Sequence, residues 1–140
     1  MKNLLKTYWP LLIILAVVGF LFSFRLGRDL LWDWDECLYG QYVKEMGRTG
    51  HFLTNIWNGY IDLQKPPLYS WLLGIPSLFG RSELNLRLLN VAGALALLGS
   101  VYVFSQQYFS RKVAVLSSLI LLTAEVFVIY SMKLSTDILY

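Results

Sequence analysis

Three long apolar runs, two of them flanking a polar loop, dominate the pattern of this chain. Residues 8–24 contain Ser23 as their only polar side chain, and residues 88–104 and 113–132 are also mostly apolar. A helix rises about 1.5 Å per residue, so the first run reaches roughly 25 Å, and flanking polar side chains can extend to the membrane surfaces to complete a span. The pattern therefore predicts three transmembrane helices, at about residues 8–24, 88–104 and 113–132.

The composition supports a membrane protein. Of the 140 residues, 56% are hydrophobic and 16% aromatic, and the mean hydropathy of +0.53 is too high for an ordinary soluble domain. A cleaved signal peptide would also begin with a charged segment and an apolar core, but no small-x-small cleavage site follows Phe24. We therefore expect an all-α integral membrane protein, one membrane region over residues 1–140, whose first helix is retained.

The distribution of charge predicts the orientation in the membrane. The short segment before the first run carries Lys2 and Lys6, and Arg111 and Lys112 lie between the second and third runs. Residues 25–87, by contrast, carry seven basic and seven acidic side chains. Short basic segments remain in the cytoplasm. We therefore expect a multi-pass protein of the cell's inner (plasma) membrane, with a cytoplasmic N-terminus and an extracytoplasmic first loop at 25–87.

Two amphipathic juxtamembrane helices are expected within this loop. The first covers about residues 36–46, because apolar side chains recur there at helical spacing. Asp35 stands at the expected N-cap, and Gly47 and Gly50 stand where such a helix ends. The apolar positions of this helix are Leu38, Tyr39, Tyr42, Val43 and Met46.

The second amphipathic helix is expected at about residues 66–79. Pro66-Pro67 can open a helix, and Pro76 should bend it. Its apolar part gives only about 18 Å of helix against roughly 30 Å of hydrocarbon, so it should be interfacial or re-entrant instead of spanning. Between the two helices, residues 51–64 are expected to be irregular, with a turn at Asn58-Gly59.

Composition also excludes some classes of function. The net charge is +3, but the basic residues are spread along the chain without the block or stripe that nucleic acid requires. Cys37 and His51 are the only residues of their kinds, so neither a disulfide within the chain nor a metal site of these residues is expected. We predict no nucleic-acid partner, no metal and no other cofactor.

The loop holds the first candidates for chemistry. Asp35 and Glu36 follow Trp32 and Trp34, whose rings belong at a membrane interface, and a carboxylate there can accept a proton from an attacking hydroxyl or orient it. Helix capping is an equally good interpretation of Asp35, and the two roles can coexist. Lys65 precedes a stiff Pro-Pro pair and suits a lipid phosphate, although an ordinary lysine extending to the membrane surface would look the same.

Four further charged residues are candidates on weaker grounds. Arg81 and Arg87 flank the start of the second span and can add to an anion site, or merely mark the membrane interface. Glu125 is an acidic residue inside a predicted span, so it is either functional or a neutral or paired group, with Lys133 as a possible partner. Asp137 should emerge on the same side of the membrane as Asp35.

Several short elements in a fixed order resemble the N-terminal part of the family 39 glycosyltransferases, which belong to the GT-C class. This family includes the protein O-mannosyltransferases and the lipid A aminoarabinose transferases. The latter usually have a basic residue where Leu38 stands and a glutamate where Gln64 stands. The matching elements are Trp34-Asp35-Glu36-x-x-Tyr39, Glu45-Met46, Gly50, Lys65-Pro66-Pro67-Leu68, Trp71, Phe79-Gly80, Glu83 and Arg87-Leu88.

The resemblance implies a reaction and roles for individual residues. Enzymes of this family transfer a sugar from a polyprenyl-phosphate donor to a lipid, glycan or protein acceptor outside the cytoplasm, and we expect inversion at the anomeric carbon. Asp35 corresponds to the catalytic aspartate and Glu36 to its neighbour. Lys65 corresponds to the lysine near the donor phosphate, and Asp137 to an acidic position after the third span. Since family members have many more spans, the chain resembles the opening part of a longer enzyme.

A stand-alone small membrane protein that binds lipid or a partner without catalysis is the alternative hypothesis. Ala92, Ala96 and Ser100 offer a small-residue face for close helix packing, and Glu125 also requires further helices. Both hypotheses therefore predict transmembrane partners beyond the three helices of this chain.

Overall fold

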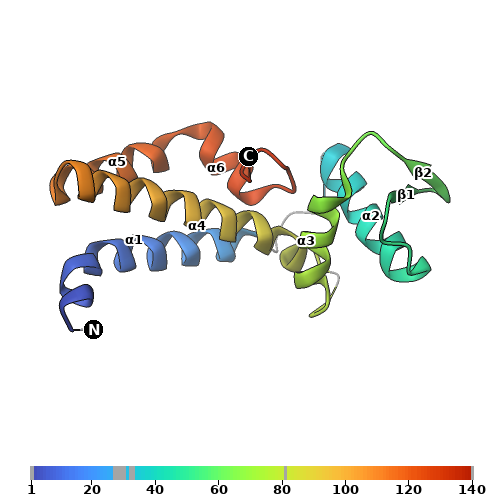
Figure 1. Cartoon of the computed structure of the whole chain (residues 1–140), viewed down its shortest axis with the longest axis horizontal. Coiled ribbons are helices and arrows are strands. Elements are labelled where there is room, and N and C mark those ends of the chain that lie inside the picture. The colour runs from blue at the N-terminus through green and yellow to red at the C-terminus, as the bar shows by residue number, and fades with distance from the viewer. Residues whose placement is uncertain (1, 27–30, 32–33, 81, 140) are drawn as a thin grey trace.

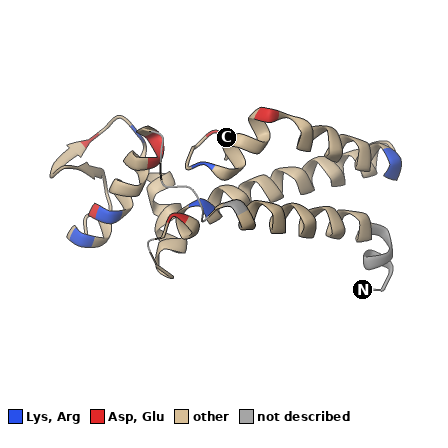
Figure 2. Cartoon of the chain, turned by 180° about the vertical axis from the view of Figure 1, so that it is seen from behind, with Lys and Arg blue, Asp and Glu red and all other residues tan. Residues whose placement is uncertain are grey.

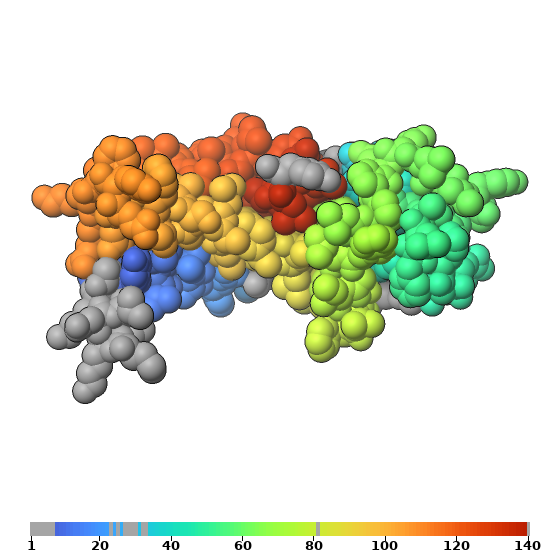
Figure 3. Space-filling model, viewed as in Figure 1, coloured from blue at the N-terminus to red at the C-terminus, as the bar shows by residue number. Residues whose placement is uncertain are grey.

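The computed structural model describes residues 2–26, 31, 34–80 and 82–139, and the side chains of residues 2–7, Ser23 and Arg25 lie outside this description. Trp32 and Arg81, two residues considered above, also lie outside it. The molecule is elongated, with long helices at one end and a smaller unit of helices and a hairpin at the other (Figures 1 and 3). Its elements are α1 (Lys2–Leu26), α2 (Trp34–Thr49), β1 (Asn55–Trp57), β2 (Tyr60–Asp62), α3 (Pro67–Ser77), α4 (Glu83–Tyr108), α5 (Arg111–Thr123) and α6 (Glu125–Met132).

Helix α4 is the central element of the bundle. It has 26 residues and begins after Ser82, whose hydroxyl accepts a hydrogen bond from the Asn85 amide. The helix thus begins five residues before the predicted start at 88, because Ser82 caps it there and the charge of Arg87 is paired inside the protein. Ala94 and Leu98 are fully buried where α4 packs against α1 and α6.

Helix α1 lies alongside α4 and has two different faces. Val18 and Phe22 are buried against α4, whereas Phe20, Leu21 and Trp9 are more than half exposed. Large apolar side chains that face outward on a long helix suit contact with lipid. The helix extends from Lys2 to Leu26 and is therefore longer than the predicted 8–24.

One helix of the described chain, α4, is long and apolar enough to cross a membrane by itself. Helices α5 and α6 meet the same criterion only when they are taken together as one bent segment, and the apolar part of α1 at Tyr8–Phe22 is shorter. The helical architecture and one candidate span are therefore observed. The full set of three spans stays a prediction.

The third apolar run is not one continuous helix, as was expected for 113–132. Helix α5 ends at Thr123 and α6 starts at Glu125, with the two helices bent by 70°. Ala124 has an extended backbone, its amide bonds to the Leu121 carbonyl, and the Thr123 hydroxyl donates to the Ile120 carbonyl. These short-range bonds close the last turn of α5, and Glu125 then starts α6, where its carboxylate suits the positive end of the helix dipole.

Residues 55–62, within the segment 51–64 that was expected to be irregular, form a short β-hairpin. Strands β1 and β2 pair antiparallel, with Trp57 opposite Tyr60 and Asn55 opposite Asp62. The turn at Asn58-Gly59, which the sequence predicted, has φ values of +50° and +84°. Two successive positive φ values are typical of the tight turn that joins twisted strands, and Asn-Gly is its preferred sequence.

The apolar face of α2 packs inside the protein and not along a membrane surface. Tyr39, Tyr42 and Val43 are buried against Tyr69 and neighbouring side chains of α3 and α4. The helix begins at Trp34, so Asp35 lies in its first turn and the expected N-cap role is wrong. Edge-to-face contact of the Tyr39 and Tyr69 rings, at 4.5 Å between centroids, adds to this packing.

Helix α3 is shorter than expected. It runs from Pro67 to Ser77 with Pro66 as its N-cap, and Pro76 lies in its last turn, where it ends the helix instead of bending it. Leu73 is fully buried, whereas Ile75, Leu78 and Phe79 at its far end are exposed. In Figure 3, α3 projects from the side of the molecule at the junction between the two units.

Candidate functional site

Asp35 and Lys65 lie next to each other. The Lys65 Nζ atom is 3.4 Å from Asp35 Oδ1 and 5.8 Å from the centre of the Tyr39 ring. Asp35 comes from the first turn of α2, and Lys65 from the loop between β2 and α3. The side chains are 50% and 33% exposed, respectively, so both remain accessible to a ligand. An ion pair this exposed contributes only about 0–1 kcal/mol to stability.

The surroundings of Lys65 keep it positively charged. The Tyr39 phenol and the Asp35 carboxylate raise the pKa of Lys65 above its ordinary value, Asp137 contributes in the same direction, and partial burial opposes them. Lysine already has an ordinary pKa near 10.4, so an upward shift leaves the ammonium protonated at neutral and mildly alkaline pH. The site therefore presents a stable point cation beside an exposed carboxylate.

Glu36 and Arg87 form a buried ion pair behind this site. Arg87 Nε and Nη2 donate to the two Glu36 oxygens at 3.1 and 2.9 Å, and Arg87 Nη1 donates to the Leu26 carbonyl at 2.9 Å. The Leu134 amide also donates to Glu36 Oε1, at 2.8 Å. Glu36 is 1% exposed and Arg87 is 4% exposed. The pair therefore ties together α1, α2, α4 and the segment that follows α6, and it faces away from bulk solvent.

Asp137 belongs to a segment that a second buried network holds in place. Tyr69 donates from its hydroxyl to Asn90 Oδ1 at 2.6 Å, and Asn90 Nδ2 donates to the Ser135 carbonyl at 2.6 Å. The Ser135 hydroxyl in turn hydrogen-bonds Asp137, whose side chain is exposed. The Asp137 carboxylate also contributes to the raised pKa of Lys65.

Glu125 and the remaining candidates lie apart from this group. Glu125 is exposed at the start of α6, and Lys133 lies just past the other end of that helix, eight residues further along the chain. His51 bonds to Thr54, and Cys37 donates weakly to the Leu31 carbonyl. Among the described residues, no group of three His, Cys, Asp or Glu side chains is placed to hold a metal ion.

Most of the charged residues lie toward one end of the molecule (Figure 2). They surround α2, the hairpin and the junction of α3 with α4, whereas the ribbon along most of the long helices carries almost none. A basic patch marks the opposite end, where Arg111 and Lys112 begin α5. The separation of these two charged ends by apolar helices suits a protein whose middle lies in lipid.

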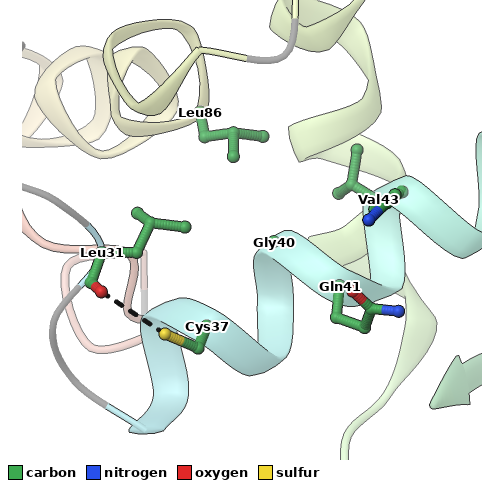
Figure 4. A pocket seen from close by; sticks show the side chains of 7 residues that line it. Leu31, Cys37, Gly40, Gln41, Val43 and Leu86 are labelled. Carbon is green, nitrogen blue, oxygen red and sulfur yellow. Dashed lines mark hydrogen bonds between the residues drawn. The ribbon is translucent and has the colours of Figure 1, made fainter. Parts of the chain in front are cut away.

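Two pockets open beside α2, and neither is lined by Asp35 or Lys65. The larger has a volume of about 270 Å³ and lies between α2, Leu31 and Leu86 of α4 (Figure 4). The smaller, of about 220 Å³, is lined by Trp34, Trp57 and polar side chains of α2 and the hairpin turn.

Several residues of the site could not be assigned from the sequence. Asn55 donates to the Lys65 carbonyl and Tyr42 donates to Asp62, close before Lys65 in the chain. These two residues and Ser135 are ordinary polar or aromatic residues in the sequence, and nothing in their spacing indicates a role. Asn90 had one signal, since a polar side chain inside an apolar helix requires an internal partner. No sequence signal indicated a role for Tyr69, because an aromatic residue after Pro66-Pro67 fits the apolar face of a helix.

The fold and the site together define a membrane-associated helical protein with an acid–lysine pair at one end of its long helices. A sequence profile of the family described as dolichyl-phosphate-mannose-protein mannosyltransferase matches residues 64–140, which is more than half of the chain. The chain belongs to this family, which is part of the GT-C class of glycosyltransferases, as its motifs suggested. Proteins of this class are embedded in membranes and use lipid-linked sugar donors.

Two individual proteins are similar to this chain. ArnT from Cupriavidus metallidurans, whose crystal structure was solved in the apo state, matches 95% of this chain with a TM-score of 0.84 and 25% sequence identity, over 25% of the ArnT chain. An uncharacterized protein of Aquifex aeolicus is 34% identical over 124 residues, which are 84% of this chain and 24% of that protein. The chain thus spans about a quarter of the length of these relatives.

Proposed function

We propose that this chain supplies the catalytic carboxylate, acting as base or orienting group, and the donor-phosphate site of a glycosyltransferase. The enzyme would transfer a sugar from a polyprenyl-phosphate donor to a lipid, glycan or protein acceptor on the extracytoplasmic side of the membrane. The observation that carries the proposal is the Asp35–Lys65 pair, with 3.4 Å between Oδ1 and Nζ, in a chain of the GT-C class. The pair places a proton acceptor and an anion-binding group side by side, and both are open to solvent.

The chemistry requires both groups. The acceptor oxygen attacks the anomeric carbon of the donor, the bond from that carbon to the phosphate oxygen breaks, and the configuration inverts. Asp35 takes the proton of the attacking hydroxyl or orients it. Lys65 stabilises the charge that develops on the leaving polyprenyl phosphate. Because Lys65 contacts Asp35 only through an exposed pair, the phosphate can take part of this contact without opening the protein core.

Glu36 and Arg87 take a different role in this proposal from the one the motifs implied. A group that binds substrate must reach it, but the Arg87 donors bond to Glu36 and to the Leu26 carbonyl, and both side chains are buried. We assign the two residues to positioning α2, and with it Asp35, against α4. Asp137 is the second acidic group of the site, and Glu125 has no part in it.

The proposed topology follows from the same charge distribution. The runs in α1, α4 and the bent α5–α6 pair would form three spans of an inner-membrane protein, with the N-terminus in the cytoplasm. The basic start of α5 would face the cytoplasm, and the charged end with Asp35 would face outward. The exposed side of α4, which includes Ala92 and Ala96, would pack against the additional helices of a longer enzyme.

Asp35→Asn in the full-length enzyme tests the proposal. Asparagine has nearly the same shape as aspartate, and Asp35 is not a cap, so the change should cost at most about 1 kcal/mol from the helix dipole. Loss of the carboxylate should lower turnover by about two to four orders of magnitude while donor binding stays near normal. Turnover is measured with a radiolabelled polyprenyl-phosphate sugar and purified enzyme.

Glu125→Gln is the matched control, because it removes a carboxylate from the first turn of α6, and Glu125 has no part in the proposed site. Its turnover should remain close to that of the unaltered enzyme. Near-normal turnover by well-folded Asp35→Asn would remove the catalytic role of Asp35. In that case lipid or partner binding without catalysis would become the better interpretation.

A further inference from the structure

The backbone of Lys65 is held by a buried amide from the hairpin. Asn55 begins β1 and is only 4% exposed. Its Nδ2 atom donates to the Lys65 carbonyl at 2.8 Å, and its Oδ1 atom accepts a hydrogen bond from the Ser70 hydroxyl at 2.8 Å. One side chain thus connects the hairpin, the loop that carries Lys65 and the first turns of α3.

A second contact fixes the same loop from the side of α2. The Tyr42 hydroxyl donates to Asp62 Oδ2 at 2.5 Å, and Asp62 Oδ1 accepts from the Gln64 amide at 2.9 Å. Asp62 is paired with Asn55 across the hairpin. The loop is therefore held at both of its ends, on one side by α2 and on the other by Asn55, and Pro66 then restricts the backbone that follows.

The chemistry at this position requires an amide. The Lys65 carbonyl needs a donor and the Ser70 hydroxyl here needs an acceptor, and the Asn side chain presents one of each. An aspartate would keep the acceptor for Ser70 but would place an oxygen against the Lys65 carbonyl. A partly buried carbonyl that loses its donor is left without a full hydrogen-bond partner, so the loop would move to find another donor.

We propose that Asn55 is a positioning residue that sets where the Lys65 ammonium meets the donor phosphate. It touches neither substrate nor Asp35, and it acts by fixing the backbone from which the Lys65 side chain extends. Ser70 anchors the amide to α3, while the Asn55–Lys65 bond itself determines the position of the loop. This inference rests on the proposed role of Lys65 in binding the donor phosphate.

Binding of undecaprenyl phosphate to the full-length enzyme in nanodiscs tests the inference. The variants are Asn55→Asp and Asn55→Ala, each alone and combined with Lys65→Ala. Alone, each Asn55 change should weaken binding about five- to tenfold, as expected for loss of the one partly buried hydrogen bond to the Lys65 carbonyl. In the Lys65→Ala background the same changes should have less than a twofold effect, because the group that Asn55 positions is then absent.

Ser70→Ala is the matched control, since it removes the other hydrogen bond of Asn55 and leaves the bond to Lys65 in place. Its affinity should stay within about twofold of the unaltered enzyme, with melting temperatures measured for every variant. Weakening by Ser70→Ala equal to that by Asn55→Asp, or equal effects of Asn55→Ala in both backgrounds, would show a merely structural role and overturn the inference. If Lys65→Ala alone has no effect on binding, the proposed function of Lys65 fails first, and the inference fails with it.

Discussion

At the scale of the residue, Asp35 and Lys65 are distinguished by their accessibility. Many ion pairs of similar geometry lie on protein surfaces and contribute little, so the 3.4 Å distance alone proves no role. A lysine that merely extends to the membrane surface would direct its tip away from the protein. The Lys65 tip instead lies between a carboxylate and the Tyr39 ring, on a loop that two partly buried hydrogen bonds hold.

Lys65→Ala should weaken use of the polyprenyl-phosphate donor by about tenfold to a hundredfold, because one charge-assisted contact is lost. Lys65→Arg keeps the positive charge, so its use of the donor should weaken much less. The measurement is the donor KM, with Lys44→Ala as the control, since Lys44 is an exposed lysine on another face of α2. An unchanged donor KM in Lys65→Ala would reduce Lys65 to a residue that marks the membrane surface.

At the scale of the elements, the Glu36–Arg87 pair is where separate helices meet. It joins residues 51 positions apart and also contacts Leu26 and Leu134. A buried pair adds little net stability compared with a well-packed apolar pair, but loss of one member leaves an uncompensated charge in the interior. The pair therefore specifies how α2 docks on α4 more than it stabilises the fold.

Glu36→Ala and Arg87→Ala should each lower the free energy of unfolding by about 3–5 kcal/mol. In the double variant, the free energy of unfolding should fall by less than the sum of the two single decreases, because no unpaired charge remains. Thermal unfolding of the full-length protein in detergent measures the stability of the two single variants and the double variant. A Glu36→Gln variant that unfolds normally yet has lost turnover would contradict this assignment and restore the catalytic role that the motif implied.

At the scale of the whole molecule, the arrangement of charge and apolar surface separates two environments. The end with α2, α3 and the hairpin carries both acidic and basic residues, and Arg111 and Lys112 mark the other end (Figure 2). The long helices between the two ends expose large apolar side chains. The hairpin turn and the connection between α4 and α5 lie at opposite ends of the molecule (Figure 1). In a membrane, these two ends should face opposite sides.

Cysteine labelling tests this topology. In a Cys37→Ser background, Tyr60→Cys at the hairpin should react with a membrane-impermeant thiol reagent added to intact cells or right-side-out vesicles. Phe109→Cys, at the connection after α4, should react only after permeabilisation. Both original side chains are more than two-thirds exposed, so access to reagent is comparable. The reverse pattern would invert the topology and place Asp35 in the cytoplasm.

The amino-acid sequence by itself determined the features that depend on neighbours along the chain. The apolar runs predicted helices in the right places, because periodicity and length are local properties. Asn58-Gly59 predicted its turn, since few other residues adopt two positive φ values, and Pro66-Pro67 predicted the start of α3. The order of the motifs was also sufficient to indicate the family, which the profile match then confirmed.

Only the tertiary structure decided which of these parts meet. The apolar face of α2 was expected at the membrane surface but packs on α3 and α4, because an amphipathic face has the same pattern whichever apolar surface covers it. Arg87 and Glu36 are far apart in sequence, as are Asn55 and Lys65, so their hydrogen bonds exist only once the fold has formed. The helix break at Ala124 could not be predicted, because the third apolar run contains no proline or glycine. Pairing between distant residues depends on the arrangement of whole elements, and no local pattern encodes that arrangement.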